Sequence, residues 1–254
     1  MNAARGGATP SSGAGPFPLT RHSVIDALEA PDADVRRQAW ETLISAYWRP
    51  VYKHLRCSWN IPSDDAEDLT QEFFARLLDG GVLERFEPAR ARFRTYLRVC
   101  LDRFTTNARK AEARLKRGGG HTHLSLDFPG AERELGASLI SDDDADEAFR
   151  REMIRSLFVA AVEALRARCL ASGKATQFAI FERYDRHDVA AAGEAPTYAT
   201  LAAEFGVPVT QVTNSLAAMR RAFRANVLEE LRAITATDAE FHAEARELFG
   251  VEPT

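Results

Sequence analysis

Eleven basic side chains between residues 85 and 117 form the part of this sequence best suited to binding an anion. They outnumber three acids, Glu87, Asp102 and Glu112, so the segment carries a local charge of about +8 in a chain whose formal net charge is -4. Clustered arginines and lysines release counterions from the phosphates of DNA or RNA, and nucleic acid is therefore the favoured partner. The basic residues are Arg85, Arg90, Arg92, Arg94, Arg98, Arg103, Arg109, Lys110, Arg114, Lys116 and Arg117.

Aromatic residues lie among these arginines. Phe93 and Phe104 keep the spacing of an apolar helix face and are expected in the core. Tyr96 lies one position off that face and is the better candidate for stacking on a base drawn out of the duplex. The alternative is a solvated cationic helix whose aromatic residues only pack.

A second group of polar residues lies near residue 210. A short helix from Tyr198 to Phe205, a glycine turn, Pro208 and a longer helix follow one another there, which is typical of a helix-turn-helix. Such a motif places the start of its second helix in the major groove, and the alternative is a helical hairpin used only for packing. The candidates for base contact are Thr210, Gln211, Thr213 and Asn214, with Arg220 and Arg221 for phosphates.

Acidic residues gather downstream of the basic segment. Residues 131–152 carry a local charge of about -5, including Asp142, Asp143, Asp144 and Asp146. We hypothesise that these acids screen the basic segment when the protein is free.

Apolar residues recur at helical spacing along the chain, so helices must position all of these groups. No stretch shows the alternation of a strand, and the predicted fold is therefore all-α. Apolar residues recur at helical spacing from Val35 to Leu55, with a kink or break at Pro50. Residues 61–81 predict a helix, with Ser63 or Asp64 as its cap, early acids and a terminal Gly80-Gly81. We expect two small helical domains joined by an acidic, flexible linker, the second containing the helix-turn-helix.

The predicted boundaries follow composition. A disordered tail over residues 1–18 precedes a first domain over 19–117, a linker over 118–145, a second domain over 146–234 and a C-terminal helix over 235–254. Thr237 with Glu240 caps that last helix.

Several function classes are disfavoured. The sequence has no apolar run long enough to cross a membrane and no signal peptide at its start, so we expect a cytoplasmic protein. Cys57, Cys100 and Cys169 lack metal-ligand or disulfide spacing, and His121 with His123 has no third ligand at a telling distance. We expect no metal, no cofactor and no enzymatic activity; a helical hydrolase using these histidines is the enzyme alternative.

The order of the pieces resembles the bacterial extracytoplasmic-function (ECF) sigma factors, two-domain specificity subunits of RNA polymerase. The resemblance rests on "DDAEDLTQEFFARLL", "FEPARARFRTYLRVCLDRFTTNARK" and "TYATLAAEFGVPVTQVTNSLAAMRRAFRANV" and covers about residues 35–117 and 176–232. The first block is similar to the family's second conserved region. The first domain would then be region 2-like and the second region 4-like.

The resemblance also implies partners: core RNA polymerase, promoter DNA, and an anti-sigma factor as a candidate regulator. It implies that the acidic helix docks on the polymerase through Asp65, Asp68, Gln71 and Glu72. The following loop and helix would melt and hold the minus-ten element through Arg90, Arg92, Arg94, Tyr96, Arg98, Arg103, Asn107, Arg109 and Lys110. The helix-turn-helix would bind the minus-thirty-five element as duplex.

The sequence departs from the family at some of these positions. Tyr96 stands where the family usually has Trp, and Thr213, Asn214 and Ser215 stand where the family often has a Lys or Arg among them. The competing hypothesis is an autonomous helix-turn-helix regulator that dimerises and binds DNA without polymerase.

Overall fold

The computed structural model describes residues 24–79, 81–112, 125–135, 145–185 and 196–253. Within these ranges the regular structure is helical and contains no strand, which confirms the all-α prediction. The predicted tail over 1–18 lies outside the described residues, as do His121 and His123.

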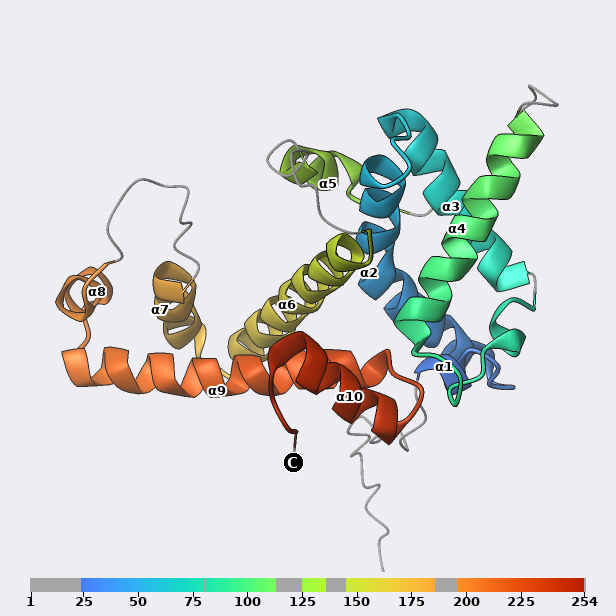
Figure 1. Cartoon of the computed structure of the whole chain (residues 1–254). Coiled ribbons are helices and arrows are strands. Elements are labelled where there is room, and N and C mark those ends of the chain that lie inside the picture. The colour runs from blue at the N-terminus through green and yellow to red at the C-terminus, as the bar shows by residue number, and fades with distance from the viewer. Residues whose placement is uncertain (1–23, 80, 113–124, 136–144, 186–195, 254) are drawn as a thin grey trace, which may run out of the picture.

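The helices follow the apolar periodicity of the sequence (Figure 1). Their bounds are α1 Val24–Ala27, α2 Ala33–Cys57, α3 Ser63–Asp79, α4 Phe93–Glu112, α5 Phe128–Leu135, α6 Ala145–Ala171, α7 Ala175–Asp185, α8 Tyr198–Phe205, α9 Val209–Ala233 and α10 Asp238–Phe249, with a 3-10 turn at Leu83–Arg85.

Helix α2 is the centre of the first half of the chain. Its N-cap is Asp32, whose carboxylate accepts hydrogen bonds from the backbone N–H groups of Asp34 and Val35. The helix continues through Pro50, which is buried inside it, so of the predicted kink or break the break does not occur. α2 packs most extensively against α6 and also against α3.

The first hydrophobic core fills the space between α2, α3 and α4. Phe74 and Phe93 are fully buried in it, and the Phe93 ring meets Tyr47 edge-on at a centroid distance of 5.7 Å. Phe104 is buried as well, so the prediction that both phenylalanines of the basic segment belong to the core is confirmed.

Helix α5 packs on α2 inside the region predicted as a flexible linker. Phe128, Ala131 and Leu135 are buried in the first core, and the Glu132 carboxylate accepts hydrogen bonds from Tyr52 and Arg56. A flexible linker therefore does not describe residues 125–135, because their amphipathic face finds a partner on α2. Residues 118–124 and 136–144 lie outside the described residues.

Helices α6 and α9 connect the two halves of the molecule (Figure 1). The second core contains the ends of these helices that lie near α7 and α8, including Leu165 and Val212. Phe149 and Met153 of α6 and Leu231 of α9 belong instead to the first core. The boundary between the two cores therefore does not lie at residue 146, the predicted start of the second domain. The division into two domains stays a prediction.

Helix α10 returns the chain to the first core. Thr237 is its N-cap, as predicted, and accepts a hydrogen bond of 3.1 Å from the Glu240 N–H. Phe241, Ala245 and Leu248 are buried, and Figure 1 shows α10 lying against α9 near the start of α4. This packing brings a row of glutamates to the basic segment.

Candidate nucleic-acid interface

The basic side chains along helix α4 have different surroundings. Phe93, Leu97 and Leu101 are fully buried, so the 3.6-residue repeat turns Arg94 and Arg98 to the side of the helix. The start of α4 is where these two arginines meet other elements.

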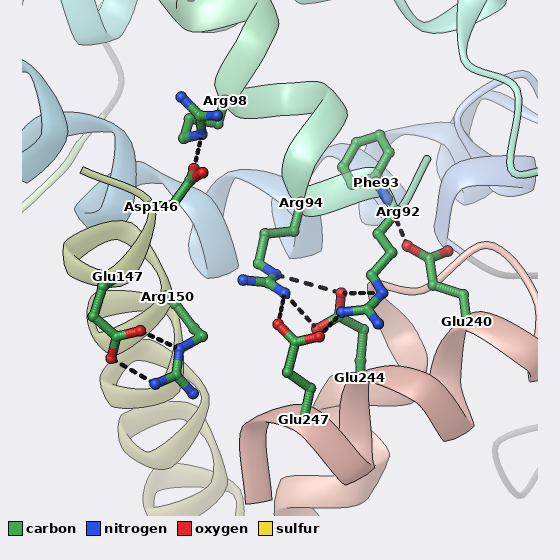
Figure 2. A network of polar contacts seen from close by, with 10 residues as sticks. All are labelled: Arg92, Phe93, Arg94, Arg98, Asp146, Glu147, Arg150, Glu240, Glu244 and Glu247. Atoms are coloured by element: carbon green, nitrogen blue, oxygen red, sulfur yellow. Dashed lines mark hydrogen bonds and ion pairs between the residues drawn. The ribbon is translucent and has the colours of Figure 1, made fainter. Parts of the chain in front are cut away.

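Arg92 and Arg94, predicted to hold DNA, form ion pairs with glutamates of α10 (Figure 2). The Arg94 Nη2 lies 2.7 Å from Glu247 Oε1 and 3.3 Å from Glu244 Oε2. Arg92 contacts the same two carboxylates. Its Nε lies 3.7 Å from Glu244 Oε1, and its Nη1 donates a hydrogen bond to Glu247 Oε2. Two glutamates therefore face two arginines about 150 residues earlier in the chain.

Glu240 completes the contact of α10 with α4. Its two carboxylate oxygens accept hydrogen bonds from the backbone N–H groups of Phe93, at 2.5 Å, and Ala236, at 2.8 Å. Burial raises the pKa of Glu240 from its ordinary value, and these two N–H donors oppose the rise. Glu240 thus satisfies an N–H group at the start of α4 that has no partner within the helix.

Arg98 belongs to a different polar cluster, centred on Asp102. Asp102 accepts hydrogen bonds from Arg98 Nη1 at 2.8 Å and Trp59 Nε1 at 2.9 Å, and it lies 2.8 Å from His54 Nε2. Arg98 is also ion-paired with Asp146 at the start of α6. Of the four aspartates expected to screen the basic segment, Asp146 is the one within the described residues.

Tyr96 is partly buried and packs within the protein. Its hydroxyl donates a hydrogen bond to the Val82 carbonyl, and its ring lies 5.2 Å from that of Phe86. Burial raises the pKa of Tyr96 to about 12. Stacking of this ring on a base would require a rearrangement at Val82, and the predicted role stays a prediction.

The remaining side chains of α4 that were predicted to bind DNA face solvent. Arg103, Asn107 and Lys110 are exposed, and Arg109 lies over the Trp59 ring at 5.1 Å. Arg90, in the loop before the helix, is exposed and pairs with Glu87 at 2.7 Å. The residues predicted to bind the minus-ten element therefore do not form one continuous exposed surface. Helices α10 and α6 cover those at the start of α4.

An open pocket of about 450 Å³ lies where α4, α6 and α10 meet. Arginines line it from both sides, and Asp146, Glu147 and Glu247 alternate with them. The lining arginines are Arg90, Arg92, Arg94, Arg98 and Arg150.

Helix α3 presents part of the predicted polymerase surface. Asp65 and Asp68 are exposed, and Glu72 pairs with Arg76 at 2.5 Å. Gln71 is buried, with 7% of its surface exposed, so it supports the packing of α3 more than it presents a contact. Two carboxylates thus remain available on this face.

The hairpin of α8 and α9 exposes all but one of the residues predicted to bind DNA there. Thr210, Gln211, Thr213 and Asn214 are exposed over the first turns of α9, and Arg221 is exposed further along it. Arg220 instead forms a two-pronged hydrogen bond with Asp185 and lies 5.3 Å from the centre of the Tyr184 ring. Residues 186–195, which connect α7 to α8, lie outside the described residues.

Glu240, Glu244 and Glu247 were not among the residues that the sequence indicated as functional. Their spacing of four and three residues puts them on one face of a helix, and this was the available signal. Nothing local indicated that this face would meet Arg92 and Arg94.

Within the described residues, no group of His, Cys, Asp and Glu side chains has the arrangement of a metal site. None of the helices described is long and apolar enough to cross a membrane.

Residues 43–115, which span most of α2 and all of α3 and the described part of α4, match the family model for Sigma-70 region 2. No curated protein and no solved structure matches the chain. The match supports a sigma factor of the sigma-70 family, and with it a role in transcription initiation together with core RNA polymerase and promoter DNA.

Proposed function

We propose that this chain, which carries a Sigma-70 region 2 match over residues 43–115, is an ECF sigma factor that directs core RNA polymerase to promoters and helps to melt them. One observation carries the proposal. Within that match, an acidic helix, α3, is followed by a basic helix, α4. Such a subunit acts by binding and needs no catalytic residue of its own.

The polymerase-binding surface in this proposal is the exposed side of α3. Asp65 and Asp68 present carboxylates there, while Leu69 and Phe73 fix the helix in the core. A basic partner surface would meet these charges without rearrangement of α3.

The DNA-binding surfaces are α4 and the α8–α9 hairpin. Arg103 and Lys110 are already exposed on α4 and would contact phosphates of the melted strand. Gln211 and Asn214 near the start of α9 would reach base edges in duplex DNA, because amide side chains can pair with adenine in the major groove.

Gel filtration of the purified chain with bacterial core RNA polymerase tests the proposal. We expect co-elution, and we expect Asp65→Ala/Asp68→Ala to weaken it because two exposed carboxylates are lost. The matched control is Asp34→Ala/Glu41→Ala, which removes two acids of α2 with side chains 81% and 64% exposed, outside the proposed surface.

Equal co-elution of both variants would contradict the assignment of α3 as the docking surface. A folded chain that never co-elutes with core polymerase would contradict the sigma-factor proposal itself. A dimer that binds palindromic duplex DNA without polymerase would then support the autonomous regulator.

A further inference from the structure

We propose that α10 is an internal competitor of DNA, whose glutamates occupy the arginines at the start of α4 in the free protein. The inference rests on the proposed function, since it assigns a regulation to the proposed minus-ten surface. It names a contact between α10 and α4 that neither the sequence nor the family match indicated.

The chemical basis is that a carboxylate and a phosphate use the same donors of a guanidinium group. Arg94 directs Nη2 to Glu247 and Glu244, and Arg92 contacts the same two residues (Figure 2). These N–H donors are the ones that an incoming phosphate would bind. A DNA strand that takes these same donors must therefore displace the carboxylates from them.

The contact is built on one face of α10. Glu240, Glu244 and Glu247 follow one another at helical spacing, and Phe241, Ala245 and Leu248 on the adjoining face are buried in the core. The apolar face thus fixes the position of α10, and the acidic face points to α4.

The three glutamates are not equivalent. Glu240 binds backbone N–H groups, and Glu244 is buried with a side chain 1% exposed, so both contribute to the packing of α10. Glu247 is 39% exposed and faces Arg92, which is 36% exposed. Glu247 also pairs with Arg94, whose side chain is 11% exposed, but Glu247 is the most exposed of the three carboxylates. An ion pair open to solvent is weak, so Glu247 is the carboxylate that a DNA strand displaces most easily.

Glu247→Gln tests this competition without removing the helix. The matched control is Glu252→Gln, because Glu252 is also exposed, pairs with Arg246 and does not contact α4. Both variants change the net charge equally. The measurement is fluorescence anisotropy of a labelled single-stranded oligonucleotide with the full free chain, with circular dichroism of each variant as a check of folding.

We expect Glu247→Gln to bind the oligonucleotide about two- to tenfold more tightly than Glu252→Gln, the range that follows from losing one or two ion pairs in which Glu247 is partly exposed. The slope of log K against log salt should become steeper by about 0.7 for each additional phosphate that the protein neutralises. In an Arg92→Ala/Arg94→Ala background the advantage of Glu247→Gln should disappear, because the released donors are absent.

Equal affinity of the two variants would overturn the inference, and so would an advantage that persists without Arg92 and Arg94. If no variant bound DNA at low salt while the chain still co-eluted with core polymerase, the inference would be wrong and the sigma-factor proposal would survive. Loss of both activities would overturn both.

Discussion

Lys53 of α2 and Glu152 of α6 form an ion pair of 2.9 Å across 99 residues of sequence, with each side chain 10% exposed. These are the two helices that pack most extensively on each other. Two charges removed from water must offset each other's lost hydration, so losing one of them is costly even where the pair as a whole adds little stability.

Glu152→Ala should therefore destabilise the protein by about 3 kcal/mol, since the Lys53 ammonium stays buried without this carboxylate. Lys53→Met/Glu152→Leu should cost much less, because apolar side chains of similar length replace both charges. Urea unfolding of the three proteins measures the difference. A double variant less stable than Glu152→Ala would contradict this account of the pair.

The docking of α5 on α2 should depend on pH through Glu132. The hydrogen bond from Arg56 lowers the pKa of Glu132, so the folded state favours the ionised carboxyl. The stability that this group contributes is present above the ordinary carboxyl pKa and is lost as the pH falls through the depressed value.

Glu132→Gln should accordingly lower the Tm by a few degrees at pH 7, and the difference from the wild type should shrink as the pH falls below the ordinary carboxyl pKa of about 4.3 and vanish below the depressed pKa of Glu132. Thermal unfolding across this pH range measures both effects. A difference that does not change with pH would show that shape, and not charge, makes Glu132 important.

The turn between α8 and α9 should require a left-handed residue. Gly206 has a φ of 64°, and a Cβ there would meet no atom within 4 Å. Gly206→Ala should then cost about 1 kcal/mol from backbone conformation alone, and Gly206→Asn should cost less because asparagine tolerates this region. Denaturant unfolding measures the free energy of unfolding of both variants. If Gly206→Ala and Gly206→Asn lost the same free energy of unfolding, backbone conformation would not be the cause.

The exposed part of α4 should supply the electrostatic component of DNA binding. Arg103→Ala/Lys110→Ala should weaken binding of a single-stranded oligonucleotide and reduce the salt slope by about 1.4, the value for two phosphate contacts. The control Arg37→Ala/Arg168→Ala removes the same charge from exposed positions on α2 and α6. If both variants gave the same slope, overall charge and not α4 would explain the binding.

The helices were predictable because their signals are local. The apolar spacing that ends at Leu55, the cap at Thr237 and the turn at Gly206 each involve residues close in sequence, and the structure has each of them. The sequence alone left a kink or a break open at Pro50, because the choice depends on packing: α2 continues there and contacts several other helices, which offsets the lost hydrogen bond.

The partners of each face were not predictable, since they come from remote parts of the chain. Periodicity shows that α10 has one apolar and one acidic face, but it does not say which helix meets them. The carboxylate of Glu240 illustrates this limit, because it binds the N–H groups of Phe93 and Ala236, whereas a capping box would direct it to Thr237.

The separation of about 150 residues between the arginines and the glutamates also sets an order in time. A ribosome adds about 5–20 residues per second, so Glu244 and Glu247 follow Arg92 and Arg94 by roughly 8 to 30 s. During that interval Arg92 and Arg94 lack the two glutamates that pair with them in the finished chain. Each new molecule therefore passes through a period in which any polyanion nearby can reach these arginines before α10 does.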